Sequence, residues 1–288
     1  TRSYSSAASD VYKRQALWDI SGKLKNLPLN SLLTKSPKPN VPIYATCWSD
    51  LKKDTNDYLR QIEKFYGKKY GGIKIYPMLD NVSISIQFVK KVREIVGDEL
   101  PLMLDLAVPE DLDQTKSFLK EVSSFNPYWI EEPVDGENIS LLAEIKNTFN
   151  MKVVTGEKQS GLVHFRELIS RNAADIFNPD ISGMGGLIDI IEISNEASNN
   201  GIFISPHCWN SMSVSASAML HVCSSISNSE KAEIFPDYIN FSKKFCELPF
   251  DIVDNKAHIN KSAGLGIVIH EDILSRLSIY SLDEKSND

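Results

Sequence analysis

The sequence has few cysteines and no surplus of positive charge. Its four cysteines stand far apart without a Cys-x-x-Cys pair, so we expect neither a disulfide framework nor a zinc knuckle, but reduced thiols as in the cytoplasm. Lysine and arginine number 31 against 38 aspartates and glutamates, for a net charge of −7. This balance argues against a nucleic-acid-binding protein, because such a protein needs a basic surface for the phosphates.

Long apolar runs are also missing. No stretch approaches the roughly 18 residues that a membrane span needs, and the N-terminus lacks the basic-then-apolar pattern of a signal peptide. Hydrophobic residues make up 42% and charged residues 24% of the chain, which is ordinary for a globular protein. These observations predict a cytoplasmic protein with neither a membrane nor a nucleic acid as its partner.

The first fifteen residues do not resemble natural protein sequence. The segment Ser5 to Gln15, SSAASDVYKRQ, is identified as the in-frame translation of a transposase adapter used in sequencing libraries, and Thr1 to Tyr4 fit the adjoining primer. We therefore expect a non-native tail over residues 1–15, which is excluded from fold reasoning, and a natural protein that extends upstream of Ala16. The plainer alternative is a polar, disordered tail.

From residue 41 onward, short apolar or β-branched runs alternate with longer amphipathic stretches. Strand–helix alternation with buried strands is typical of a parallel sheet. Eight such units in about 200 residues favour an α/β fold of the closed (β/α)8 barrel type over an open doubly wound sheet. No Gly-x-Gly-x-x-Gly follows the first strand, so a dinucleotide-binding fold loses its main support. The expected strands are Val41–Thr46, Gly72–Tyr76, Leu100–Leu104, Tyr128–Ile130, Lys152–Thr155, Asp175–Asn178, Ile202–Ser205 and Ala232–Phe235.

Ionisable residues stand at the carboxyl end of successive expected strands, 23 to 29 residues apart. A single acid after a strand is usually a helix cap or a solvated loop residue. Seven in phase are hard to attribute to chance, and in a barrel the carboxyl ends of the strands converge on one face. The pattern therefore predicts one ring of functional side chains. Its members are Tyr76, Asp105, Glu131, Glu157, Asp180, His207 and Glu233.

The ring has the composition of a metal-assisted acid–base site. Asp105, Glu131 and Glu157 follow consecutive strands, and three carboxylates form a hard oxygen site suited to Mg²⁺. A divalent ion there can bind a substrate carboxylate and neutralise the charge that develops when an α-proton is removed. His207 with Asp180 predicts an oriented general acid or base. Lys74 and Tyr76, two residues apart on one strand, point the same way from the other side.

Five motifs in order, LMLDLA, WIEEP, TGEKQSG, NPDISGMGG and SPHCWNS, resemble the mandelate racemase subgroup of the enolase superfamily. The resemblance extends from about Ala16 to the C-terminus. It implies that Mg²⁺ is bound by Asp105, Glu131 and Glu157, and that His207 and Asp180 form a catalytic dyad. It also implies that Glu233 is the acid that binds the substrate carboxylate, although the surrounding sequence KAEIFPDY aligns only loosely. Two sequence neighbours of the ring, Lys158 and Trp209, are further candidates for contacting the substrate or forming the pocket wall.

The sequence departs from the family pattern at two places. The second strand usually carries Lys-x-Lys with the second lysine as base, whereas this chain has Lys74-Ile75-Tyr76. Tyrosine has an ordinary pKa of about 10, so Tyr76 as base needs help from Lys74 and the metal; otherwise Tyr76 hydrogen-bonds the substrate. We also expect the family's N-terminal α+β capping domain to be missing from this chain, which would leave the pocket half open. The expected parts are a tail (1–15), a linker helix from the capping domain (16–40), the barrel (41–249) and a tail that would pack on the capping domain (250–288).

The resemblance leaves three functions open. The first is an acid-sugar dehydratase, acting for example on a galactarate-like aldarate, that removes the α-proton and the β-hydroxyl to give a 2-keto-3-deoxy acid. The second is an isomerase on the same site, either a racemase or epimerase or a sugar-lactone cycloisomerase. The third is a truncated, non-catalytic fragment. For the full-length protein the resemblance implies a small carboxylic-acid substrate and a homo-oligomer.

Overall fold

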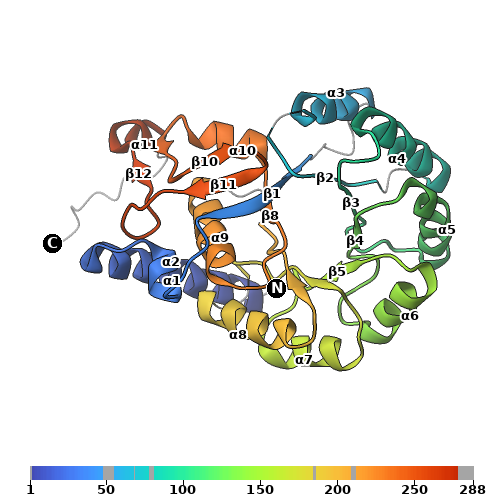
Figure 1. Ribbon diagram of the computed structural model, residues 1–288, viewed down its shortest axis with the longest axis horizontal. Coiled ribbons are helices and arrows are strands. Elements are labelled where there is room, and N and C mark those ends of the chain that lie inside the picture. Colours follow the sequence, from blue (N-terminus) through green and yellow to red (C-terminus); the bar gives the residue numbers. More distant parts are fainter. Residues whose placement is uncertain are drawn as a thin grey trace.

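The structure is a computed structural model that describes residues 2–47, 55–67, 69–77, 81–183, 186–208 and 212–277. Parallel strands β1 to β7 lie side by side in chain order, and each lies next to helices on the outside (Figure 1). Each strand lies within one or two residues of its expected position. They are β1 (Asn40–Thr46), β2 (Ile73–Ile75), β3 (Leu102–Asp105), β4 (Trp129–Glu131), β5 (Val153–Thr155), β6 (Ile176–Phe177), β7 (Phe203–Ile204) and β8 (Ala232–Ile234).

The strands close into a ring. β8 pairs in parallel with β1, with Tyr44 opposite Glu233. Between β7 and β8, Ile204 of β7 forms a parallel bridge with Ser229, which lies just before β8. The Ile204 N–H donates to the carbonyl of Asn228 (2.9 Å), and its own carbonyl accepts from the Glu230 N–H (2.8 Å). The predicted (β/α)8 barrel is therefore confirmed.

Three of the helices between the strands begin at polar caps that the sequence supplies. Asn81, Asp111 and Asn138 each accept a hydrogen bond from a backbone N–H three residues later, which satisfies one free donor of the helix start. The barrel helices are α3 (Thr55–Phe65), α4 (Val82–Val96), α5 (Leu112–Val122) with a 3₁₀ turn (Ser123–Phe125), α6 (Ile139–Phe149), α7 (Leu162–Ser170), α8 (Leu187–Ser198), α9 (Ser213–Ser225) and α10 (Pro236–Ser242).

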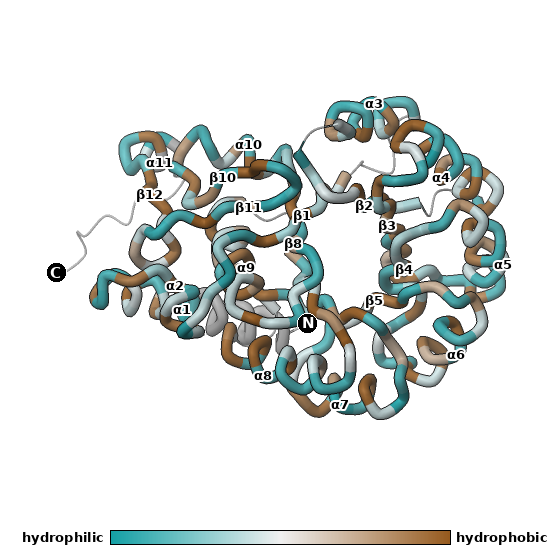
Figure 2. The backbone as a smooth tube through the Cα atoms, viewed as in Figure 1, coloured by the Kyte–Doolittle hydropathy of each residue, from teal (hydrophilic) through white to brown (hydrophobic). Residues whose placement is uncertain are grey.

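The hydrophobic core has two layers because successive side chains of a strand point to opposite faces. The larger layer lies between the outer face of the strands and the inner faces of the helices, where Figure 2 shows brown segments. A smaller cluster fills the inside of the barrel, so the barrel is packed rather than an open pore. This inner cluster consists of Tyr44, Met103, Trp129, Val154 and Ile176.

The remaining elements lie beside the barrel. β10 (Phe250–Val253) and β11 (Lys256–Ile259) form an antiparallel hairpin that pairs with the first half of β1. α1 (Arg2–Lys25) continues unbroken across the boundary expected at residue 15. The origin of residues 1–15 and the domain boundaries stay predictions. Among the described residues, no helix is long and apolar enough to cross a membrane. The other elements are α2 (Leu29–Leu33), β9 (Cys246–Glu247), β12 (Val268–Ile269) and α11 (Glu271–Leu277).

Candidate metal centre and catalytic site

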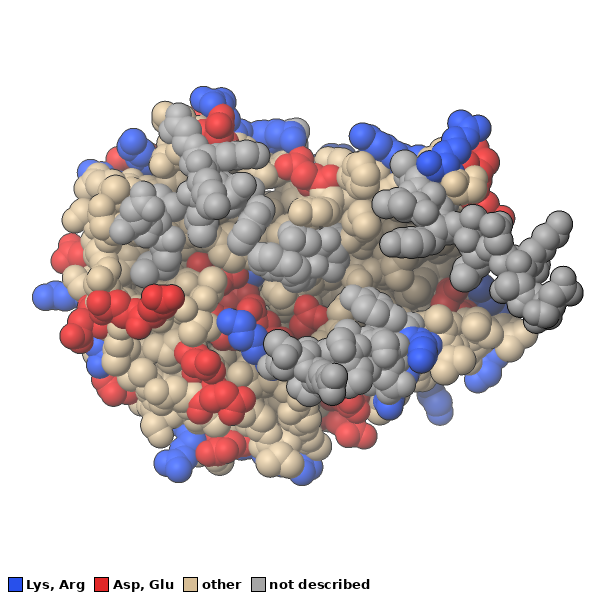
Figure 3. Space-filling view, turned by 180° about the vertical axis from the view of Figure 1, so that it is seen from behind, with Lys and Arg blue, Asp and Glu red and all other residues tan. Residues whose placement is uncertain are grey.

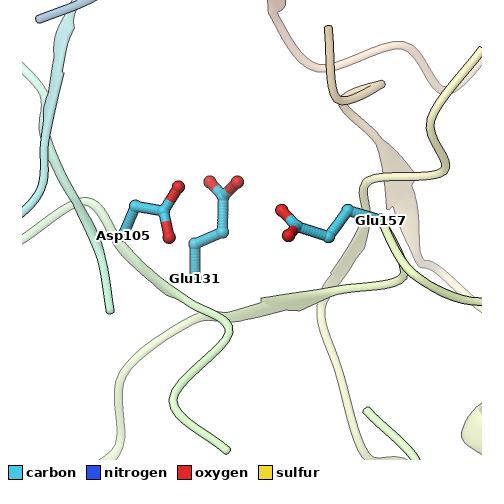
Figure 4. A group of neighbouring side chains, drawn as sticks. All are labelled: Asp105, Glu131 and Glu157. Carbon is cyan, nitrogen blue, oxygen red and sulfur yellow. The ribbon is translucent and has the colours of Figure 1, made fainter. Parts of the chain in front are cut away.

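Three carboxylates meet at the carboxyl ends of β3, β4 and β5. Asp105 ends β3, Glu131 ends β4, and Glu157 lies two residues beyond β5. One oxygen from each lies within 4.8 Å of the others, and Figure 4 shows the three side chains pointing toward one another. The register explains this convergence, because Asp105 pairs directly with Glu131 across β3 and β4. The structure thus brings together the triad that the sequence predicts.

A buried lysine lies among these acids. The side chain of Lys74 is inaccessible to solvent, and its Nζ lies 2.7 Å from Glu131 Oε1, 2.8 Å from Glu233 Oε1 and 3.2 Å from Asp105 Oδ2. Burial opposes the charge of Lys74, but the carboxylates of Glu131 and Glu233 outweigh it and raise the pKa of Lys74 well above its ordinary value. Lys74 is therefore a fixed positive charge in this cluster.

Glu131 is held on both of its oxygens. Besides Lys74, Oε1 accepts from Asn178 Nδ2 (3.1 Å), and Oε2 accepts from Trp129 Nε1 (3.2 Å). Burial raises the pKa of Glu131 to about 8. The carboxylates of Asp105, Glu233 and Glu157 add to this rise, and the ammonium of Lys74 opposes it. Four carboxylates thus face one ammonium and the His207 imidazole in a largely buried cluster.

A divalent cation fits this donor set. The three oxygens are those that Mg²⁺ prefers, and its two charges would offset the negative charge of the carboxylates gathered here. Figure 3, which shows the molecule from behind, has Asp and Glu side chains in the hollow near its centre. Asp105, Glu131 and Glu157 are the residues that could hold the ion.

His207 and Asp180 form the expected pair. Nδ1 of His207 lies 2.7 Å from Asp180 Oδ2, and Nε2 lies 3.6 Å from Glu157 Oε2. Burial lowers the pKa of His207, but the Asp180 hydrogen bond and the carboxylates of Glu157 and Glu233 outweigh it, raising the pKa to about 10. Asp180 in turn accepts from the Ser182 N–H (2.6 Å). The dyad is anchored, and the second imidazole nitrogen faces the triad.

Glu233 lies on the inside of β8, as the spacing predicts. It accepts from Thr46 Oγ1 (2.6 Å) and from the Cys208 N–H (2.8 Å), in addition to its ion pair with Lys74. Burial raises the pKa of Glu233, but Lys74 and His207 more than compensate, and the pKa falls below its ordinary value. Glu233 is a buried carboxylate that links β1, β2, β7 and β8.

Tyr76 follows β2 and is almost fully buried. Its ring centroid lies 5.9 Å from Lys74 Nζ. Burial raises the pKa of Tyr76 well above its ordinary value; Lys74 acts in the opposite direction, and Asp105 and Glu233 add to the rise. Its backbone N–H donates to the hydroxyl of Tyr58 (2.9 Å), which donates to the carbonyl of Cys47 (2.6 Å). Tyr58 thereby ties the ends of β1 and β2 together.

The two remaining candidates differ in what can be said of them. The side chain of Lys158 is half exposed, with Nζ 4.0 Å from Glu157 Oε1, so it borders the triad from the solvent side. Trp209 lies outside the described residues.

The sequence pattern did not identify three polar residues that donate hydrogen bonds to carboxylates of the ring. Asn178, Thr46 and Trp129 each donate to one of its carboxylates. The signal that could have found them is the alternation along a strand, because each lies two residues before or after an inward-pointing position. Asn178 also stands two residues before Asp180 in the NPD motif.

Comparison with known proteins identifies relatives of this barrel. The sequence profile of the enolase C-terminal domain-like family matches residues 57–273. A crystal structure of an enolase from environmental shotgun sequencing of the Sargasso Sea is 94% identical with a TM-score of 0.92, covering 96% of this chain and 74% of that chain.

Two further relatives are dehydratases. The L-talarate/galactarate dehydratase of Salmonella typhimurium LT2 is 31% identical over 192 residues, which are 67% of this chain and 48% of that protein. This chain thus spans about half the length of that curated relative. The L-talarate dehydratase of Polaromonas sp. JS666, solved with Mg and L-glucarate, is 25% identical with a TM-score of 0.78, covering 90% of this chain and 70% of that one.

Proposed function

Since the chain belongs to the enolase C-terminal domain-like family, we propose that it forms the catalytic barrel of a Mg²⁺-dependent acid-sugar dehydratase. The observation that carries the proposal is the convergence of three carboxylate oxygens within 4.8 Å, beside a His–Asp pair in which Nε2 of His207 lies 3.6 Å from Glu157 Oε2. The similarity to the talarate and galactarate dehydratases supports an aldarate as substrate.

In this proposal Asp105, Glu131 and Glu157 hold the ion. A bound Mg²⁺ neutralises the negative charge that builds up on the substrate carboxylate as the α-proton leaves. Lys74 contacts the carboxylates of Glu131 and Glu233 and holds both in place. The ligands therefore need not reorganise during the reaction. The surrounding apolar barrel layer keeps water away from these charges, which strengthens each interaction.

The reaction needs one group to take a proton and one to give a proton. The C–H bond next to the carboxylate breaks and its proton passes to a base. The β-carbon–oxygen bond then breaks, and the hydroxyl leaves as water with a proton from an acid. The resulting enol tautomerises to a 2-keto-3-deoxy acid. We assign these roles to His207, oriented by Asp180, and to Tyr76 on the opposite side, whose raised pKa favours the neutral hydroxyl.

The test is to incubate the chain with Mg²⁺ and a panel of aldarates, including galactarate, talarate and glucarate, in deuterated water. We expect 2-keto acid to form, with deuterium at C3, because the enol takes up a solvent proton at this former β-carbon when it tautomerises. Glu131→Gln should abolish both. Glu137→Gln, the same change at an exposed glutamate on the neighbouring loop, should leave both intact. Deuterium uptake without 2-keto acid would replace the dehydratase by an isomerase, and neither product nor uptake would refute catalysis by this chain.

A further inference from the structure

Glu132, the second glutamate of the WIEEP motif, contacts the loops of both neighbouring ligand strands. It lies immediately after Glu131 and is completely buried. Its backbone N–H donates to the carbonyl of Val154 (3.0 Å), and its own carbonyl accepts from the Val108 N–H (3.0 Å). Its carboxylate Oε1 accepts from Thr155 Oγ1 (2.9 Å) and from the Gly156 N–H (3.0 Å). One residue thus joins the ends of β3, β4 and β5.

These partners are the immediate neighbours of the metal ligands. Val108 lies three residues after Asp105, and Gly156 directly precedes Glu157. Gly156, whose N–H meets the carboxylate, has a φ of +132°, a conformation that residues with a Cβ rarely adopt. The position of Glu157 therefore depends on the contact between Glu132 and the Thr155–Gly156 peptide.

The backbone around this contact is strained. Glu132 has a φ of +44°, and Val108 has a φ of +60°. Positive φ is unusual for a glutamate and an outlier for a β-branched residue. Such conformations persist only where the surroundings enforce them, and they concentrate at functional sites. Here the Val108–Glu132 hydrogen bond joins the two strained residues.

We propose that Glu132 is a positioning residue that sets the geometry of the metal triad by clamping the β3 and β5 loops to β4. The inference rests on the proposed metal site, since it assigns a role toward the same ion. Oε2 of Glu132 is buried and accepts no hydrogen bond from the described residues, so Oε1 alone makes the side-chain clamp. Glutamine, which has the same shape and one carbonyl oxygen, can therefore replace it.

The experiment measures Mg²⁺ affinity of the whole chain by calorimetry in the wild type, Glu132→Met, Glu132→Gln and the exposed control Glu137→Gln. We expect Glu132→Met to weaken Mg²⁺ binding by about tenfold or more, as removal of an outer partner of a metal ligand does. Glu132→Gln should restore most of the affinity, and Glu137→Gln should match the wild type. If Glu132→Gln loses as much as Glu132→Met, the charge of Glu132 matters and not its clamp, and the inference is wrong.

A second readout covers the case in which Glu132→Met does not fold. Thr155→Val removes one of the two donors to Oε1 while keeping the side-chain shape. It should weaken Mg²⁺ binding and increase hydrogen exchange at the Gly156 amide in the metal-free protein. Wild-type affinity and wild-type exchange in this variant would overturn the inference. A wild-type chain that binds no Mg²⁺ would instead refute the metal site itself, and the role of Glu132 with it.

Discussion

Lys74 Nζ lies 2.8 Å from Glu233 Oε1 in an ion pair that no solvent reaches. The sequence predicts that Glu233 binds the substrate carboxylate and that Lys74 assists Tyr76, and in the barrel Lys74 and Glu233 meet each other. Lys74 also contacts Glu131 and Asp105. Its ammonium is therefore the charge that allows several carboxylates to be buried together, since an unpaired buried charge is costly.

Replacing Lys74 by methionine should destabilise the metal-free protein by about 3–5 kcal/mol, because it leaves buried carboxylates without their cation. Urea unfolding in the presence of a chelator measures the effect, and added Mg²⁺ should recover part of it. Lys64 pairs with Asp237 at 2.7 Å on the surface, with both side chains about half exposed. Lys64→Met should cost no more than about 1 kcal/mol. Equal costs for the two variants would contradict the role given to Lys74.

His207→Asn should reduce turnover and α-proton exchange by about 10²–10⁴-fold, the usual contribution of a general acid or base. Asp180→Asn should also slow the reaction, because the imidazole would lose the partner that fixes its tautomer. Mg²⁺ affinity, measured by calorimetry, should stay near the wild-type value in both. His270→Asn, at a partly exposed position, serves as control. Wild-type turnover in His207→Asn would remove this residue from the mechanism.

The burial of His221 leads us to expect that the protein loses stability in mild acid. It is buried between α9 and α2, and its Nδ1 accepts a hydrogen bond from the Asn30 N–H (3.2 Å), so protonation would break this contact. Burial lowers the pKa of His221 to about 4, whereas the unfolded chain has a pKa of about 6.5. Between these values the unfolded state binds the proton and the folded state does not. The free energy of unfolding should thus fall by about 3 kcal/mol as the pH falls through this range.

His221→Gln keeps an acceptor near Asn30 but cannot take up the proton. The difference in unfolding free energy between pH 7 and about pH 4.5 should therefore be smaller in this variant than in the wild type. Urea titrations at the two pH values measure it. The same pH dependence in both proteins would show that other groups cause the acid sensitivity.

Gly156→Ala should be more damaging than Gly161→Ala. Both glycines have a positive φ, +132° and +82°, but a Cβ at Gly156 would lie 2.9 Å from the ring of Phe165, whereas at Gly161 it meets nothing within 4 Å. Gly161→Ala should show only the backbone cost, about 1 kcal/mol. Gly156→Ala should add about 1–3 kcal/mol of overpacking and weaken Mg²⁺ binding, because Glu157 follows directly. Similar thermal stability in the two variants would be evidence against this reasoning.

The sequence by itself determined the barrel and the members of the ring. The alternation of apolar runs with amphipathic stretches depends only on local period, and it placed each strand within one or two residues. The spacing of Asp105, Glu131 and Glu157 then sufficed to bring them together, because parallel strands of a barrel share one carboxyl end. The pairing of His207 with Asp180 followed in the same way.

Only the tertiary structure decided how these side chains are partnered. Whether Lys74 faces a substrate or three carboxylates depends on the radius of the barrel and on side chains from β3, β4 and β8, which are distant in sequence. The hydrogen bonds of Glu132 with Thr155 and Gly156 depend on a left-handed backbone at Glu132. Periodicity does not encode such a conformation, because it arises from contacts on both neighbouring strands at once.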